Sequence, residues 1–380
     1  MSWQRFNKIS VSNLQGLRLT SEVTMQSSSR HSFESSQTPT CLRLLAVLSL
    51  MLSACGSSGT TKLDGGTDAP MDVEGPLTFE RDWTRYPAIF TATGIDEIDA
   101  LGDVHGDPAA MIRTLVTAGL VSPTDPRQWI GGKRFLVVTG DVIDKGTASL
   151  VVIDILMALE PQAQAAGGNV VVTLGNHEAE FIGDPSSSKV VEFRTELATN
   201  GLVASDIALG KTAYGQWLLN RPVAASIDGW FFSHSGNTGT LGTADITQKY
   251  KALFAITGVG GRAKLGDSFL AADDSILEAR GWWAGGTSSI DVIDARLAKL
   301  SAKHIVFGHD PGVVAFPDDA AGERERGEIA SRYGGRLFLI DSGMSSAIGY
   351  SVGGLLRITR APTETAVSLY SDGTTQSLYP

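Results

Sequence analysis

Cysteine is scarce in this chain: among its 380 residues only Cys41 and Cys55 are cysteines. The sequence beyond Cys55 can therefore contain neither a disulfide nor a thiolate metal ligand. It also has no cysteine nucleophile, and no serine lies in a recognisable nucleophile motif. Any metal ion bound by this part of the chain must use oxygen and nitrogen ligands.

Long apolar runs are missing as well. The run from Leu44 to Leu52 has nine residues, whereas a helix needs about 20 to cross a membrane. Arg43 precedes the run and the small residues Ser53 and Ala54 follow it, which is typical of a secretory signal. The LSAC at its end resembles the lipobox of bacterial lipoproteins, which predicts that Cys55 is lipidated.

The N-terminal part of the sequence is thus predicted to be a signal peptide of the lipoprotein type, residues 1–54, with Met25 as an alternative start. An ordinary signal peptide is the other interpretation. Residues 55–76 are rich in Gly, Ser, Thr and Asp and predict a flexible tether. Residues 77–380 then form one domain, and we expect a monomer that faces the periplasm from the bacterial cell envelope, attached to the membrane through lipid.

Basic residues are outnumbered: the chain has 31 Lys and Arg against 41 Asp and Glu. A chain this acidic has no broad attraction for phosphate backbones, which excludes nucleic acid as a general partner.

Short apolar runs recur along the domain, and each ends at glycine or a polar cluster. Helical spacing of apolar residues separates the first three runs, which predicts a parallel α/β core with functional groups at the carboxyl ends of its strands. After residue 222, VAASIDGWFFS predicts a hairpin that turns at Asp228-Gly229. With LFLIDSG and GGLLRIT it indicates a second, more antiparallel sheet. The five runs are EIDAL, RFLVVT, NVVVTL, WFFS and HIVF.

Four of the six histidines follow such runs, next to aspartates and an asparagine. Imidazole, carboxylate and amide oxygen together suit Mn, Fe or Zn better than Ca or Mg. His31 and His304 fall elsewhere, and His304 is expected to be a solvated residue at the start of a strand. The residues at the strand ends are Asp103, His105, Asp141, Asn176, His177, His234 and His309.

These motifs in their order resemble those of the calcineurin-like metallophosphoesterases, and within them the phosphoprotein phosphatase group and its bacterial Shewanella-like members. The resemblance implies an α/β fold in which a β-sandwich of two mixed sheets is flanked by helices, with a metal site at the carboxyl ends of the strands. The motifs are GDVHG (102–106), GDVIDKG (140–146), GNHE (175–178), FSHSG around His234 and GHD (308–310).

The resemblance further implies two metal ions. Asp103 and His105 would bind the first and Asp141 would bridge both, while Asn176, His234 and His309 would complete the second. Two such ions, about 3.5–4 Å apart, activate a shared water as hydroxide for in-line attack on a phosphoryl group.

Proton transfer to the leaving group is assigned by the resemblance to His177, supported by Asp144. The alternative for His177 is a supporting contact to the metal ligands. Glu178 is expected to be structural.

Two positions concern phosphate binding. The family usually has Arg where this chain has Lys145, which offers a point charge in place of a planar fork. Arg280 is the expected second phosphate-binding arginine, and Arg262 competes for that role. Ser235 replaces a usual glycine without affecting the ligand beside it.

The function that follows is a metal-dependent phosphatase acting on a phosphorylated protein, a peptide or a small phosphoester. One alternative is a nucleotide or dinucleoside polyphosphate hydrolase, and another is a non-catalytic binding lipoprotein. The insertion from Phe181 to Asn220 is expected to form two short helices and to shape the cleft.

Overall fold

The computed structural model describes residues 79–254, 270–286 and 288–380. The predicted signal peptide and tether lie outside these residues. Within the described residues no helix is both long and apolar enough to span a bilayer.

The first of two sheets, here called sheet I, has six strands in the order β12-β11-β10-β2-β3-β4. Its parallel half comes from the N-terminal part of the domain and its antiparallel half from the C-terminus. The strands are β2 (Glu97–Leu101), β3 (Phe135–Val138), β4 (Asn169–Val172), β10 (Gly354–Thr359), β11 (Thr365–Tyr370) and β12 (Thr375–Tyr379).

Sheet II also has six strands, in the order β1-β5-β6-β7-β9-β8. In sheet II, β5–β6 and β8–β9 are antiparallel and the other pairs are parallel. Sheet II is therefore mixed, as sheet I is. The strands are β1 (Ile89–Ala92), β5 (Ala224–Ile227), β6 (Trp230–Ser233), β7 (His304–Phe307), β8 (Ala330–Arg332) and β9 (Leu337–Leu339).

Alternation along the strands makes the two sheets a sandwich. In β3, Val137 belongs to the core shared by the sheets, while its neighbours Leu136 and Val138 belong to the core under the helices. In β6, Phe232 and Phe231 divide in the same way. Since successive side chains of a strand point to opposite faces, each sheet has one face against the other sheet and one against helices. This confirms the expected fold class.

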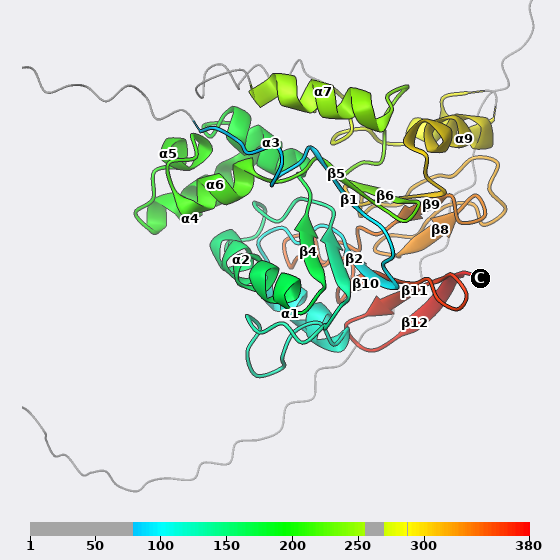
Figure 1. Ribbon diagram of the computed structural model, residues 1–380, viewed down its shortest axis with the longest axis horizontal. Coiled ribbons are helices and arrows are strands. Elements are labelled where there is room, and N and C mark those ends of the chain that lie inside the picture. The colour runs from blue at the N-terminus through cyan, green and yellow to red at the C-terminus, as the bar shows by residue number, and fades with distance from the viewer. Residues whose placement is uncertain (1–78, 255–269, 287) are drawn as a thin grey trace, which may run out of the picture. The chain divides into compact units, whose positions relative to one another are not determined.

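Helices flank the sheets on both sides (Figure 1). Sheet I is covered by α1 (Pro108–Thr117) and α2 (Ser149–Ala165), and α9 (Ser289–Leu300) with the short η3 (Trp282–Ala284) lies beside sheet II. The other helices in the part of the chain that the structure describes are α3 (Asn176–Gly183), η1 (Ser188–Val190), α4 (Val191–Thr199), α5 (Ala204–Ala208), α6 (Ala213–Leu219) and α7 (Thr243–Phe254).

Three expectations about local structure were wrong. The strand in GGLLRIT, β10, pairs antiparallel with β2 and so joins sheet I rather than the second sheet. The insertion holds three α-helices, α4 to α6, which lie beside α3 in Figure 1, where two were expected.

His304 is the third error, because its side chain is buried. The imidazole stacks on Trp230 with 3.9 Å between the ring centres, and its Nδ1 lies 2.6 Å from the carbonyl oxygen of Gly335. Its position at the first residue of β7 places it under the C-terminal strand, near Tyr379.

Candidate metal centre

The carboxyl ends of β2, β3, β4, β6 and β7 meet at one edge of the sandwich. The six predicted ligands lie one to four residues after the last residues of these strands, and all are buried. Possible ligand atoms form two groups, each within 4.8 Å: His105, Asp141 and His177, and Asp141, His234 and His309.

Asp141 belongs to both groups because its Oδ2 lies between them. This oxygen is 3.5 Å from Nε2 of His105 and 3.4 Å from Nε2 of His234. Asp103 adjoins the first group, with its Oδ2 3.8 Å from His105 Nε2. Asn176 adjoins the second, with its Oδ1 2.9 Å from His234 Nε2. The geometry fits the expected two-ion site with a carboxylate shared between the ions.

Sharp turns at the strand ends make this crowding possible. His105, Asp141 and His309 have positive φ angles of 45°, 51° and 70°, a region that residues other than glycine rarely adopt. At Gly175 and Gly308 a Cβ atom would overlap Asp141 and the Asp103 carboxylate, respectively. The loops therefore require glycine where backbone passes against a ligand.

Backbone carbonyls determine which nitrogen of each imidazole faces the centre. Nδ1 of His105 lies 3.2 Å from the oxygen of Ile143, and Nδ1 of His234 lies 2.9 Å from that of Thr139. For His309 the nitrogen facing a carbonyl is Nε2, 3.1 Å from the oxygen of residue 278. A carbonyl only accepts hydrogen bonds, so the nitrogen facing it carries the proton. The other nitrogen of each ring faces the centre, where it can bind a metal ion once any proton on it has been displaced.

Burial and neighbouring charges shift the pKa values of the side chains at the centre. Burial raises the pKa of Asp103 to about 6 and lowers the pKa of His105 to about 3. Burial also acts to lower the pKa of His234, but the Asp141 and Asp103 carboxylates outweigh it and raise this pKa to about 10. Two buried carboxylates thus require positive charge between them, which divalent ions supply well.

His177 sits at the open side of the cluster, with 12% of its side chain exposed. Its Nδ1 is 2.9 Å from Oδ2 of Asp144, and its Nε2 is 4.0 Å from Oδ2 of Asp141. The other oxygen of Asp144 accepts the backbone N–H of Phe193, in the first turn of α4, at 3.0 Å. Burial opposes a rise in the pKa of His177, but Asp141 and Asp144 raise it overall, so the charged imidazole is favoured.

Glu178 holds the turn that carries Asp141. Its buried carboxylate accepts four backbone N–H groups, from Asp141 and Gly175 on Oε2 and from Val142 and Ile143 on Oε1, at 2.8–3.1 Å. Burial raises the pKa of this carboxyl, yet four converging donors fit only the ionised form. The expected structural role of Glu178 is therefore what the geometry describes.

The two predicted phosphate-binding residues lie at the rim. Nζ of Lys145 is 2.9 Å from Nε2 of His105. Arg280 pairs with Asp310 at 3.1 Å and donates to the His309 carbonyl at 3.2 Å, with 55% of its side chain exposed. Arg262, the competing arginine, lies outside the described residues.

Sequence reasoning missed two carboxylates near the centre. Asp341 follows β9 as the other acids follow their strands, so LFLID contained a usable signal. It is buried beside Asp103, one of its oxygens accepts the Gly343 N–H, and burial raises its pKa well above the usual range. Glu278 lies outside regular α-helix and strand and contacts the amide of Asn176 at 3.2 Å. No periodic pattern marked it.

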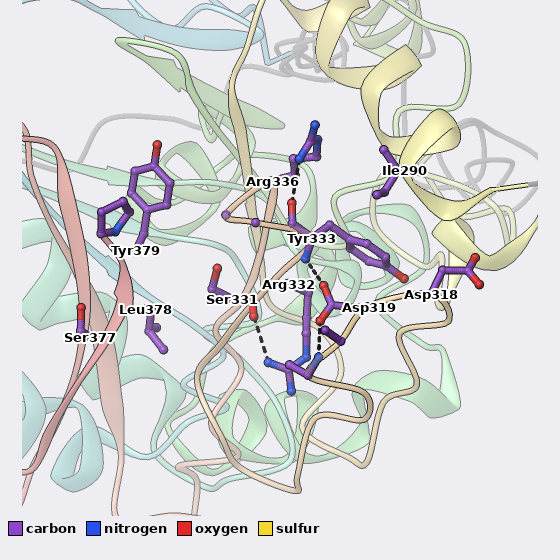
Figure 2. A pocket seen from close by; sticks show the side chains of 15 residues that line it. Ile290, Asp318, Asp319, Ser331, Arg332, Tyr333, Arg336, Ser377, Leu378 and Tyr379 are labelled. Carbon is purple, nitrogen blue, oxygen red and sulfur yellow. Dashed lines mark hydrogen bonds between the residues drawn. The ribbon is translucent and has the colours of Figure 1, made fainter.

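A separate cavity of about 780 Å³ opens between the edge strands β8 and β12 (Figure 2). Its arginines are already engaged, because Arg332 donates to the carbonyls of Gly322, Ser331 and Glu323, and Arg336 pairs with Asp294. None of the residues in the two possible metal-binding groups lines it. The possible metal-binding groups of the described residues lie at the strand ends instead.

Comparison with known proteins supports the resemblance. Residues 97–312 match the model of the calcineurin-like phosphoesterase family. An uncharacterised protein of Schizosaccharomyces pombe is 25% identical over 304 residues, 74% of this chain and 81% of that protein. Shewanella-like protein phosphatase 2 of Arabidopsis thaliana is 36% identical over 83 residues, but the match covers 22% of this chain and 21% of the relative.

Solved structures agree on the fold. A cold-active protein-tyrosine phosphatase of a psychrophilic Shewanella has a TM-score of 0.59 at 23% identity, covering 77% of this chain and 83% of that one. A protein serine/threonine phosphatase of Saccharomyces cerevisiae, described as similar to human PP5, has a TM-score of 0.50 at 16% identity, covering 78% and 85%.

Proposed function

The chain belongs to the calcineurin-like phosphoesterase family, and from this premise we propose that it is a two-metal phosphatase that hydrolyses phosphomonoesters of proteins or peptides. The observation that carries the proposal is the position of Asp141, whose Oδ2 lies within 3.5 Å of a histidine nitrogen in each of the two ligand groups.

Six residues would hold the ions. Asp103 and His105 stand on one side of Asp141, and Asn176, His234 and His309 stand on the other. When bound, a pair of Mn, Fe or Zn ions supplies an activated water and neutralises phosphoryl oxygens. The ring nitrogens turned inward by the backbone carbonyls support this ligand set.

Proton delivery is assigned to His177. Asp144 accepts from Nδ1 and favours the charged imidazole, in which Nε2 also carries a proton. That proton faces the centre and can be transferred to the leaving oxygen of the substrate. The Phe193 N–H holds the second oxygen of Asp144 and so keeps the carboxylate in place behind the imidazole. Lys145 and Arg280, at the rim, would bind phosphoryl oxygens.

The choice of phosphorylated protein or peptide is supported by the Arabidopsis thaliana relative, which is named a Shewanella-like protein phosphatase. The GNHE motif, with Glu178 in its last position, favours the same group over dinucleoside polyphosphate hydrolases.

The test is a comparison of substrates with the purified, Mn-loaded protein. Peptides carrying phosphoserine, phosphothreonine or phosphotyrosine should release phosphate faster than dinucleoside polyphosphates do, and p-nitrophenyl phosphate reports general activity. A His177→Asn variant is the control for mechanism. Preference for dinucleoside polyphosphates would replace this proposal with the alternative hydrolase, and absence of turnover on every substrate would refute both.

Attachment to the cell envelope is the remaining part of the proposal. It is supported by the sequence alone, through LSAC at residues 52–55 and the polar tether that follows. Replacing Cys55 by Ser should move the protein from the membrane fraction to the soluble fraction, and unchanged fractionation would count against the lipid anchor.

A further inference from the structure

The amide of Asn176 can serve a metal ion in only one of its two orientations. Its Oδ1 lies 2.9 Å from Nε2 of His234, at the centre, while its Nδ2 lies 3.2 Å from Oε1 of Glu278 on the other side. Rotation of the amide by half a turn would present NH2, which has no lone pair for a cation, to the centre. A neighbouring group must therefore hold the amide with Oδ1 toward the centre.

We propose that Glu278 is the positioning residue that orients Asn176 toward the second metal ion. A carboxylate only accepts hydrogen bonds, so the end of the amide facing Glu278 must be the donor, Nδ2. The oxygen then points to the centre. This inference rests on the proposed function, because it concerns a ligand of the same two-ion site.

The backbone around Glu278 is held firmly enough for this role. Its N–H donates to Oγ of Ser275 at 3.1 Å, and the same hydroxyl donates to the carbonyl of Leu270. The carbonyl of Glu278 faces Nε2 of His309 at 3.1 Å. One residue thus contacts two predicted ligands of the same ion, by its side chain and by its backbone.

The charge of Glu278 is offset locally. Nζ of Lys189, in η1 of the insertion, lies 3.6 Å from Oε1 of Glu278 and 2.8 Å from Oε1 of Glu180. A bare carboxylate this close to the centre would repel a phosphate dianion. Lys189 reduces that repulsion, which lets an acceptor stand beside Asn176 without excluding the substrate.

The test compares metal binding by the full chain and its variants, measured by calorimetric Mn titration and by the metal content of dialysed protein. Wild type should bind two ions. Glu278→Met, which removes the acceptor, should weaken one of the two ions about 10- to 100-fold, the usual cost of losing a partner behind a metal ligand. Glu278→Gln, which can still accept, should lie closer to wild type. Glu278→Met with unchanged affinity for both ions would overturn the proposal.

A second pair of variants separates orientation from folding. Asn176→Asp has oxygen at both ends, so its orientation no longer matters, although its charge opposes that of Glu278. In the Asp background, Glu278→Met should therefore leave metal affinity unchanged or improve it. An equal loss in both backgrounds would show that Glu278 acts through general stability, and would also overturn the proposal.

Failure of the proposed function would look different. Wild type that binds two ions but hydrolyses no phosphoester would refute the phosphatase assignment, while the comparison of metal affinities would still decide the role of Glu278. In an active enzyme, Glu278→Met should also lower kcat/KM by a factor similar to its loss of metal affinity at limiting Mn, with recovery in excess Mn.

Discussion

Replacing Glu178 by Gln should destabilise the loop that carries Asp141. The two side chains have almost the same size, but Gln substitutes NH2 for one carboxylate oxygen. Each oxygen of Glu178 accepts two backbone N–H groups. Whichever way the Gln amide turns, two of the four N–H groups will face another donor.

The lost hydrogen bonds set the size of the expected destabilisation. A hydrogen bond to a charged acceptor contributes about 1.5–3 kcal/mol, and a buried donor left without a partner forfeits that amount. Two lost bonds give roughly 3–6 kcal/mol, a large share of the about 5–15 kcal/mol that stabilises a typical domain. Because one of the four donors is the N–H of Asp141, the metal affinity of the centre should fall together with the stability.

Urea unfolding of wild type and Glu178→Gln, each in excess chelator and in excess Mn, measures both effects. Glu196→Gln is the matched control: its carboxylate also accepts two backbone N–H groups, from Ser149 and Leu150 at 2.8 and 2.9 Å, but it is only half-buried and water can replace a lost bond. We expect the control to lose about 0.5–1.5 kcal/mol. A loss below about 1 kcal/mol for Glu178→Gln would refute the argument.

Three further changes have distinct expected results. His177→Asn should lower kcat on phosphoserine peptides about 10²- to 10⁴-fold but affect p-nitrophenyl phosphate much less, since nitrophenolate leaves without a proton; equal losses in steady-state assays would contradict proton donation. Lys145→Arg should lower KM for phosphopeptides, because the guanidinium group can make a bidentate contact with the phosphate. An unchanged KM would show that lysine and arginine bind phosphate equally well at this position. Burial lowers the pKa of His304, so below its ordinary pKa of 6.5 the unfolded chain binds a proton that the folded chain does not, and the folded state loses stability as the pH decreases. The melting temperature should therefore decrease less steeply from pH 7 to pH 5 for His304→Gln than for wild type, and equal slopes would contradict this.

Local sequence patterns predicted the strands well, because both the apolar runs and the glycine or polar residues that end them can be read from neighbouring positions. EIDAL, WFFS and HIVF coincide with β2, β6 and β7, each an apolar run ended by glycine or a polar residue. The place of β10 was mispredicted because its partner β2 lies far away in sequence, and nothing inside GGLLRIT states which edge it joins. The burial of His304 depends on Trp230 and on the C-terminal strand, so the residues around it in sequence could not reveal it.

The grouping of the candidate ligands was predictable for a topological reason. Parallel strands bring their carboxyl ends to one edge, so the residues after β2, β3 and β4 had to meet. The contacts that hold these side chains were not predictable in the same way. Glu278 reaches Asn176 from a segment without α-helical or strand pattern, and Phe193 supplies a backbone N–H, which every residue but proline possesses.

The division of the ligands between the two sheets has a mechanical consequence. Asp103 and Asp141 follow strands of sheet I, whereas His234 and His309 follow strands of sheet II, and the N–H of His309 contacts the carboxylate of Asp103 across 206 residues of chain. A metal pair held by all of them would join distant parts of the chain as a disulfide does, in a domain that contains no cysteine. Such a cross-link is reversible: binding at 1,000 times the dissociation constant adds about 4 kcal/mol, and a chelator removes it without breaking a covalent bond.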